Sequence, residues 1–344
     1  MSPDSKHFSG YKLKVQGCYG KISDFQFDRD AYNNALSRKF PQTIDTFSGR
    51  SSLIIFTATD SLEPSGNKSF IDLRYLLDQA NEILNQGPPS PLNCNGTSHL
   101  KQLSLGFRDL QNSGKPSNFG GIFGQNEAIQ QLEAQILKTT KWLTHFDEFQ
   151  KLPQSLQIKM LQGAWSVWNR LDGLASIALE IKRRVQEEKL RKMKNDELIF
   201  KWDNEMEVDM SWCSKYALEE LKFFLPISNE IRFDSLTRSL IELSPSDVEL
   251  SYMLGQLCFH YVGKRFQGEI LQVAENFQEI SANDLHEYYT HEMNTPYYMK
   301  RLAQMMKINN QIQREVYKHK EKMDLAMVFG VFCVDVSHPD MFLL

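Results

Sequence analysis

Apolar residues recur at helical intervals through most of the second half of the chain. After Gln125 they are separated by three, four and seven residues, so they fall on one face of a helix. Four residues define this face: Ile129, Leu132, Ile136 and Leu143. A second run, residues 152–179, has apolar residues on its neighbouring faces as well. We therefore predict a second helix that is buried nearly all round, at the centre of a domain.

The N-terminal part of the chain lacks such a period. Residues 1–69 hold many Ser, Gly and Asp, and only Ser51–Phe56 has the pattern of a short strand or a buried patch. Helical character begins at Phe70. We therefore divide the chain into an N-terminal region, residues 1–69, which we predict to be partly disordered, and a helical domain, residues 70–344.

Prolines and glycines mark two loops between the predicted helices. The first loop holds Pro88, Pro89 and Pro91, and the second, residues 112–124, holds four glycines. Residues 302–329 contain neither residue type, so they predict one long helix or two helices joined end to end.

A short segment between the helices has a strand pattern. Met206, Val208 and Met210 alternate with polar residues, and Asp203 and Asn204 supply turn chemistry just before them. We predict a small β-hairpin at this point.

The charge and composition of the chain argue against nucleic acid and membranes as partners. The net charge is −4 over 344 residues, although the first 50 residues carry eight Lys or Arg against five Asp. An acidic body argues against a broad nucleic-acid surface, because phosphate binding depends on Lys and Arg displacing counterions. No apolar stretch of about 18 residues is present, so no membrane crossing is predicted. Five widely spaced cysteines suit a reducing compartment and unpaired thiols.

The sequence lacks most of the motifs that mark catalytic and metal-binding sites. His286 and His291 lie five residues apart, whereas a zinc-binding helix needs histidines four apart to share a face. The sequence has no GxxxxGK[ST] phosphate loop, no GxSxG elbow and no CxxC pair. We therefore predict that the protein is not an enzyme and uses neither a cofactor nor a metal ion.

Several large apolar side chains fit two interpretations. Trp165 and Trp168 lie among apolar neighbours, where they either line a ligand cavity or fill the core. The same choice applies to pliable methionines near the C-terminus, which suit an adaptable pocket wall and are also common core residues. These methionines are Met305, Met306, Met323 and Met327.

Residues 142–165 resemble the ligand-binding-domain signature of nuclear hormone receptors. In that family a helix ends in an aromatic residue, a Leu-Pro turn follows, and a Gln opens the next helix. Six positions keep this spacing: Phe149, Leu152, Pro153, Gln157, Leu161 and Trp165. The later segments WSVWNRL, SPSDVELSYMLGQLCFHYVGKRFQGEIL and SHPDMF resemble the nematode branch of the family. The resemblance runs from about Phe70 to Leu344.

Residues 22–56 resemble the hinge that follows the DNA-binding domain in that branch. Receptor DNA-binding domains need two zinc modules with four cysteines each, and residues 1–69 contain only Cys18. The resemblance therefore implies a chain without its zinc DNA-binding domain. Three origins would each give such a sequence: a truncated isoform, an error in the gene model, or a true loss of the DNA-binding domain.

The resemblance implies an all-α fold, a three-layer α-helical sandwich with a small β-hairpin, which encloses an apolar cavity. The expected partner for that cavity is a small lipophilic ligand, held mainly through buried apolar area. The candidate ligand-binding residues are Leu132, Ile136, Trp165, Trp168, Met323 and Met327.

In this family a short terminal helix packs over the cavity and completes a groove for a coregulator helix. The basic residues of that groove fall here on Thr144 and Gln162, and Lys141 lies one turn earlier as a substitute. At the other end of the groove Asp340 stands where the family has a glutamate. The candidate coregulator-binding residues are Lys141, Thr144, Gln162, Asp340, Met341, Phe342 and Leu343.

Receptors of this family also pair through the long helix near the C-terminus. The resemblance therefore implies a homodimer, or a heterodimer with a related receptor. The candidate dimer residues are Leu302, Met306, Asn310 and Gln313.

The function that the resemblance implies is ligand sensing coupled to transcription regulation, in the nucleus or in both nucleus and cytoplasm. The chain would act through coregulator or receptor partners and would not bind DNA directly. The alternative is a ligand-free helical scaffold that dimerises with a partner receptor and dampens it.

Overall fold

The computed structural model describes residues 14–15, 46–50, 53–59, 67–88, 97–113, 122–192, 207–225 and 235–342. The helices are α2 (Arg74–Gln86), α3 (His99–Ser113), α4 (Gln125–Leu143), α5 (Asp147–Gln150), α6 (Gln154–Lys192), α7 (Leu218–Leu221), α8 (Ser235–Leu243), α9 (Asp247–Phe266), α10 (Gly268–Glu287) and α11 (Met299–Val328). A π-helical turn, η2 (Tyr288–Glu292), and a terminal 3-10 turn, η3 (Pro339–Met341), complete them. The strands are β1 (Lys14–Val15), β2 (Thr46–Arg50), β3 (Leu53–Thr59), β4 (Asn67–Asp72), β5 (Ile122–Phe123), β6 (Glu207–Val208) and β7 (Val334–Val336).

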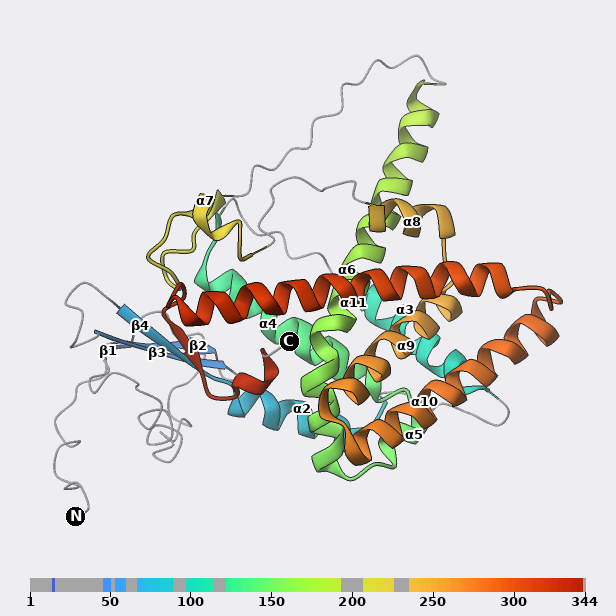
Figure 1. The fold of residues 1–344 in the computed structure, drawn as a ribbon, viewed down its shortest axis with the longest axis horizontal. Coiled ribbons are helices and arrows are strands. Elements are labelled where there is room, and N and C mark those ends of the chain that lie inside the picture. The colour runs from blue at the N-terminus through green and yellow to red at the C-terminus, as the bar shows by residue number, and fades with distance from the viewer. Residues whose placement is uncertain are drawn as a thin grey trace.

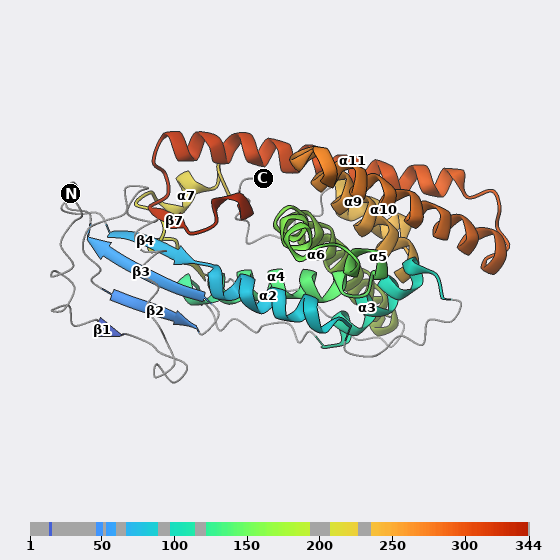
Figure 2. The same ribbon diagram turned by 90° about the horizontal axis from the view of Figure 1, so that it is seen from below.

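The helices pack in three layers, as the predicted α-helical sandwich requires. Helices α6 and α9 lie in the middle, between α11 on one side and α2, α3 and α4 on the other (Figures 1 and 2). Helix α9 is buried on most of its surface, and its Leu254, Leu257 and Cys258 are fully buried. The all-α fold class is confirmed. Among the described residues, no helix combines the length and apolarity that a membrane crossing needs.

The two longest helices follow the predicted patterns. The first half of α6 is buried nearly all round, including Leu161, Trp168 and Leu171, whereas most of residues 182–186 are exposed. The predicted long C-terminal helix is a single element, α11, of 30 residues. Its core-facing side carries Met305 and Ile312, both fully buried.

A mixed sheet lies at one end of the helical body (Figure 1), with strand order β1-β2-β3-β4-β7. The predicted strand at Ser51–Phe56 is confirmed within β3, where Ile55 is buried. Strand β4 pairs antiparallel with β3 and parallel with β7. Because β4 contains both Ser69 and Phe70, it runs across the point where helical character begins in the sequence and connects the N-terminal strands to the C-terminal segment.

The predicted β-hairpin lies only partly within the described residues. Its described strand, β6, pairs in parallel with β5, through Ile122 opposite Glu207 and Phe123 opposite Val208. A parallel pair needs a long crossover connection, and here α4, α5 and α6 provide it. The alternation at Met206, Val208 and Met210 thus predicted a strand, and the pairing with β5 is additional to the prediction. The other arm expected for the hairpin, with Asp203 and Asn204, lies outside the described residues.

A buried ion pair fixes the start of α9 against α11. Glu249 is buried, and its carboxylate accepts hydrogen bonds from Arg301 Nη2 (2.7 Å) and the Ser246 amide (2.8 Å). Arg301 Nε and the Tyr289 hydroxyl donate to the other carboxylate oxygen. Burial alone would raise the pKa of Glu249, but the hydrogen bonds from Arg301, Tyr289 and Ser246 together hold that pKa below its usual value.

A glycine in α3 makes room for a buried histidine. A Cβ atom on Gly106 would lie 2.3 Å from His145 Cδ2 and 2.4 Å from His145 Cγ. His145 is buried, and burial lowers its pKa despite the nearby Asp109, so the ring is neutral at pH 7. The contact is near the base of the ring, where the side chain has little freedom to move away.

Substituting Gly106 with alanine should therefore destabilise the protein by about 1–3 kcal/mol, because overpacking displaces the His145 ring. Gly173 in α6 is the matched control, since a Cβ there meets nothing within 4 Å. Gly173→Ala should stabilise the helix by up to about 1 kcal/mol. Urea unfolding of both variants measures the contrast. Equal effects of the two substitutions would show that the α3–His145 contact is not tight.

Candidate functional site

The C-terminal segment turns back toward the body after α11 (Figure 1). Gly330 has a φ of 58°, a left-handed conformation that glycine adopts without strain. The Val331 amide donates to the Ala326 carbonyl at 2.9 Å, which closes the end of the helix. The chain thus reverses direction at Gly330 and leads into β7.

Hydrogen bonds hold β7 in place from two directions. On the β4 side, the Ser69 amide donates to the Cys333 carbonyl and the Ser337 amide donates to the Ile71 carbonyl, both at 2.9 Å. On the side of the segment before α7, the Cys333 amide donates to the Cys213 carbonyl at 2.8 Å. The path from α11 to η3 is therefore part of the folded structure.

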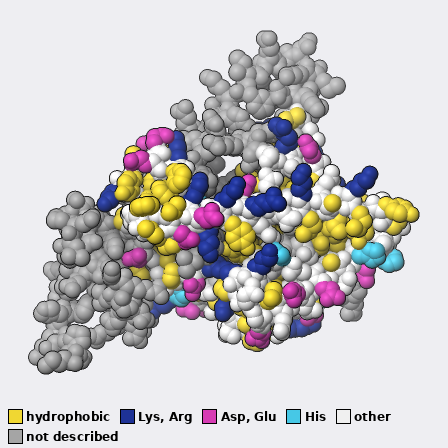
Figure 3. Space-filling view, viewed as in Figure 1, with side chains coloured by type: hydrophobic (Ala, Val, Ile, Leu, Met, Phe, Trp, Pro, Cys, Tyr) yellow, Lys and Arg dark blue, Asp and Glu magenta, His cyan; other side chains and the backbone are white. Residues whose placement is uncertain are grey.

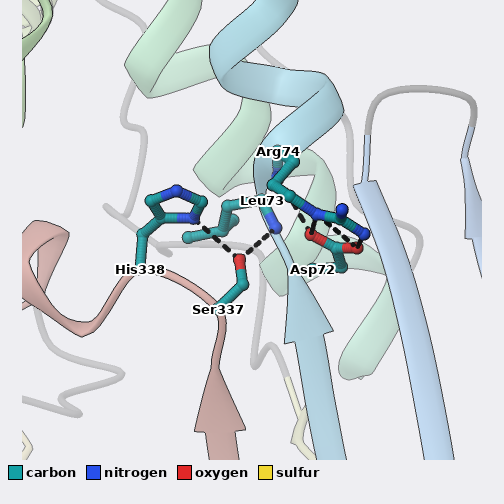
Figure 4. Close-up of polar contacts among 5 residues, drawn as sticks. All are labelled: Asp72, Leu73, Arg74, Ser337 and His338. Atoms are coloured by element: carbon teal, nitrogen blue, oxygen red, sulfur yellow. Dashed lines mark hydrogen bonds and ion pairs between the residues drawn. The ribbon is translucent and has the colours of Figure 1, made fainter. Parts of the chain in front are cut away.

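A polar cluster joins the end of β7 to the start of α2 (Figure 4). The Ser337 hydroxyl accepts a hydrogen bond from the Leu73 amide at 2.9 Å and lies 2.9 Å from His338 Nδ1. Beside it the buried Asp72 carboxylate pairs with Arg74 at 2.6 Å and also accepts the Arg74 amide at 3.1 Å. The Leu73 amide has no partner within α2, and the hydroxyl of Ser337, 264 positions away in sequence, accepts its hydrogen bond.

Trp165 and Arg265 hold the terminal turn η3. The Trp165 indole Nε1 donates to the Met341 carbonyl at 2.9 Å, and its ring packs edge-on against Phe342 with centroids 5.8 Å apart. The Arg265 guanidinium donates to the Asp340 carbonyl. Met341 is fully buried. Helices α6 and α9 therefore anchor the last described turn of the chain, and we call residues 331–342 the terminal segment.

The other coregulator candidates lie around the junction of α4 and α6. Lys141 is exposed in the last turn of α4, and Gln162 is half-buried one turn before Trp165. Thr144 is buried, and its hydroxyl donates to the Lys141 carbonyl at 2.7 Å. Its side chain satisfies the helix end and does not face solvent. Leu343 lies outside the described residues.

The structure separates the six ligand-binding candidates. Ile136 and Trp168 are fully buried, and the Trp168 ring contacts Trp142 and Phe107 at centroid distances of 5.8 and 6.2 Å. Trp165 belongs to the contact with η3, described above. Leu132 and Met323 are half-buried. Met327 is 58% exposed, at the end of α11, where other apolar side chains also gather on the surface (Figure 3).

A pocket of about 300 Å³ opens between α3, the middle of α6, α8 and the start of α9. Its walls include Phe107, Ala178 and Leu240, and Lys182 and Ser244 lie at its polar part. None of the six ligand-binding candidates lines it. Among the described residues, no three His, Cys, Asp or Glu side chains are placed to share a metal ion.

The dimer candidates follow one another at steps of three and four residues and so lie on one side of α11, which is only partly exposed. Leu302 and Met306 are half-buried and pack against the core, while Asn310 is exposed and Gln313 is half-buried. Only part of this set is therefore available to a partner in the present conformation.

Two features of this site escaped the sequence interpretation. The first is the pairing of β4 with β7, which places Ser337. The alternation in Val334–Val336 could have indicated β7, but it is too short to identify a strand by itself. Arg265 had no signal, because a charged residue in the last turn of a helix is common at surfaces.

Comparison with known proteins agrees with this architecture. Residues 114–329 match the family model for the ligand-binding domain of nuclear hormone receptors. The chain belongs to the nuclear hormone receptor family, whose members are ligand-regulated transcription factors.

Its relatives include three receptors of Caenorhabditis elegans. The chain is 41% identical to nuclear hormone receptor family member nhr-98 over 343 residues, which are 98% of this chain and 78% of that protein. It is 39% identical to nhr-55 over 339 residues (96% and 79%), and 40% identical to nhr-130 over 334 residues (92% and 75%). The resemblance to the nematode branch is confirmed.

Proposed function

We propose that this chain senses a small lipophilic molecule and regulates transcription in the nucleus through protein partners. The observation that supports the proposal is the anchored terminal segment, in which Trp165 donates a hydrogen bond to the Met341 carbonyl and the Met341 side chain is fully buried. The terminal turn docks on α6 at Trp165, one helical turn after Gln162, and in this proposal an amphipathic coregulator helix lies next to it. Ligand binding would act by shifting the population of the docked turn.

The charged groups at that surface favour weak partner binding. Lys141 is exposed on α4 and Asp340 is exposed on η3, and in this proposal they are the cation and the anion for the two ends of the coregulator helix. Thr144, where the family has a basic residue, is buried and bonded to a backbone carbonyl. We expect coregulator peptides to bind with reduced affinity for this reason.

Pairing through α11 completes the proposal. Asn310 is exposed on that helix and Gln313 is half-buried, which suits a reversible, partly polar interface with a second copy or a related receptor. The candidate residues of the ligand site and of this interface remain predictions.

A second candidate function is a ligand-free scaffold that dampens a partner receptor. Its support is the packing of Trp168, whose ring contacts Trp142 and Phe107 in the core where the sequence also allowed a cavity wall. Such a chain would dimerise but would not respond to any lipophilic molecule.

Peptide binding tests the first candidate. A labelled helical peptide containing Leu-x-x-Leu-Leu is titrated against the full chain and against a chain lacking residues 338–344, with fluorescence anisotropy as the readout. We expect the deletion to weaken binding at least about tenfold, or about 1.4 kcal/mol. Tyr297→Ala is the control, because Tyr297 is 97% exposed in the turn before α11. Equal affinity of the intact and shortened chains, both folded by circular dichroism, would contradict the proposal.

A further inference from the structure

We propose that the pocket between α3, α6, α8 and α9 binds a monocarboxylate with an apolar body, which Lys182 holds by its charged end. The proposal names a ligand class for the sensing function proposed above and in that sense rests on it. The site itself is separate from the residues that the sequence suggested, because none of those residues lines this pocket.

The pocket walls are largely apolar and come from helices α3, α6, α8 and α9. Phe107 of α3, Ala178 of α6 and Leu240 of α8 are buried at the back of the pocket. Leu179 also lines the pocket, yet it is 70% exposed. An exposed leucine beside a concave apolar surface leaves area that a bound apolar group would remove from water, which favours binding.

The charges of the lining residues favour a single negative charge. The charged groups are Arg108, Asp247 and Lys182, whose sum is one net positive charge. Arg108 donates through Nε (2.9 Å) and Nη2 (2.8 Å) to the same oxygen of Asp247, so these two groups neutralise each other. The positive charge that remains is that of Lys182.

Lys182 has a neutral partner in this conformation. Its Nζ donates to the Ser244 hydroxyl at 2.7 Å, and in the part of the chain that the structure describes no carboxylate pairs with it. A carboxylate placed between the two would accept one hydrogen bond from Lys182 and a second from the Ser244 hydroxyl. Hydrogen bonds to a charged acceptor are stronger than those to a neutral one, so this exchange favours the bound ligand.

Ser244 is held in position by its backbone. It has a φ of 45°, an uncommon value for a residue with a side chain. Its amide donates to the Leu240 carbonyl at 2.8 Å, and its carbonyl accepts from Arg301 at 3.3 Å. The backbone that carries the hydroxyl is therefore held at the pocket before any ligand arrives, which reduces the entropy that binding would cost.

The volume sets the size of the ligand. About 300 Å³ holds roughly ten groups the size of a water molecule, at about 30 Å³ each. This corresponds to a medium-chain fatty acid or an arylalkyl carboxylate. A dianion such as a phosphate monoester fits less well, because its second charge would have no cation and would face Asp247.

Calorimetric titration of the full chain with decanoate, below its micelle concentration, tests the proposal. We expect saturable binding of one equivalent, and at least tenfold weaker binding of decanol, which has the same chain without the charge. Lys182→Met should weaken decanoate binding at least tenfold. Arg183→Met is the matched control, because Arg183 is the next residue of α6, pairs with Glu180 at 2.8 Å and does not line the pocket.

A third variant tests the location. Ala178→Leu places extra side-chain volume in the pocket and should reduce decanoate binding while Lys182 is intact. The proposal is wrong if decanoate does not bind, or if it binds equally to the intact chain and to Lys182→Met. Deletion-sensitive peptide binding without decanoate binding would overturn this site alone. Decanoate binding without any effect of the deletion on the peptide would overturn the coregulator surface alone.

Discussion

Replacing Trp165 with alanine should destabilise the domain by about 3–5 kcal/mol, the cost typical of removing a large buried ring. Trp165 is only 8% exposed, so its ring leaves a cavity that its neighbours fill incompletely. The substitution also removes the hydrogen bond to the Met341 carbonyl and the ring contact with Phe342. The terminal segment should therefore lose its anchor on α6 as well.

The conservative variant Trp165→Phe separates the loss of buried ring volume from the loss of the hydrogen bond to Met341. It keeps most of the ring volume and loses the indole N–H, so it should cost about 1 kcal/mol, the usual net contribution of one hydrogen bond. Urea unfolding of the three proteins gives the free energies. An unchanged melting temperature for Trp165→Ala would mean that this ring is not buried against η3.

Replacing Arg301 with methionine should cost about 3 kcal/mol at pH 7. The substitution leaves the buried Glu249 carboxylate without its cation, and breaking a buried pair in this way usually costs about 3–5 kcal/mol. We expect the lower end of that range, because the Arg301 side chain is 36% exposed and water screens part of its charge. Arg314→Met, an exposed arginine on the same helix, is the control.

The effect of Arg301→Met should depend on pH. The folded protein holds the pKa of Glu249 below its usual value of 4.5, so the stabilisation from the pair is fully present above that value. It is lost as the pH falls through the lowered pKa, because the carboxyl then takes up a proton. The difference between wild type and variant should therefore shrink in acid. A difference that stays constant from pH 7 to pH 3 would contradict the assignment of the pair.

Helical periodicity correctly predicted the amphipathic helices, because each of them packs on the core through a single apolar face. Ile136 and Met305 lie on apolar stripes in the sequence and are fully buried in the structure, because an amphipathic helix has only one way to bury such a stripe. The signature around Gln157 also predicted local structure correctly. Its side-chain amide donates to the Phe149 carbonyl at 3.0 Å and so ties α5 to the start of α6.

Contacts between distant segments could not be predicted in the same way. Leu73 and Ser337 meet because β4 and β7 pair in parallel, and neither strand is long enough to show which partner it has. Trp165 and Trp168 lie one turn apart in sequence, yet one contacts η3 and the other contacts Trp142. The pocket at Lys182 likewise depends on how four helices are placed relative to one another, which the apolar pattern of a single helix does not predict.

The central claim is that the terminal segment is a docked part of the fold. Hydrogen exchange at single amides, followed by NMR, tests it most directly. The Cys333 and Ser337 amides donate to the Cys213 and Ile71 carbonyls, so we predict that both exchange far more slowly than the amide of the exposed Tyr297. Exchange at Cys333 and Ser337 as fast as at Tyr297 would show a free tail and would contradict the account.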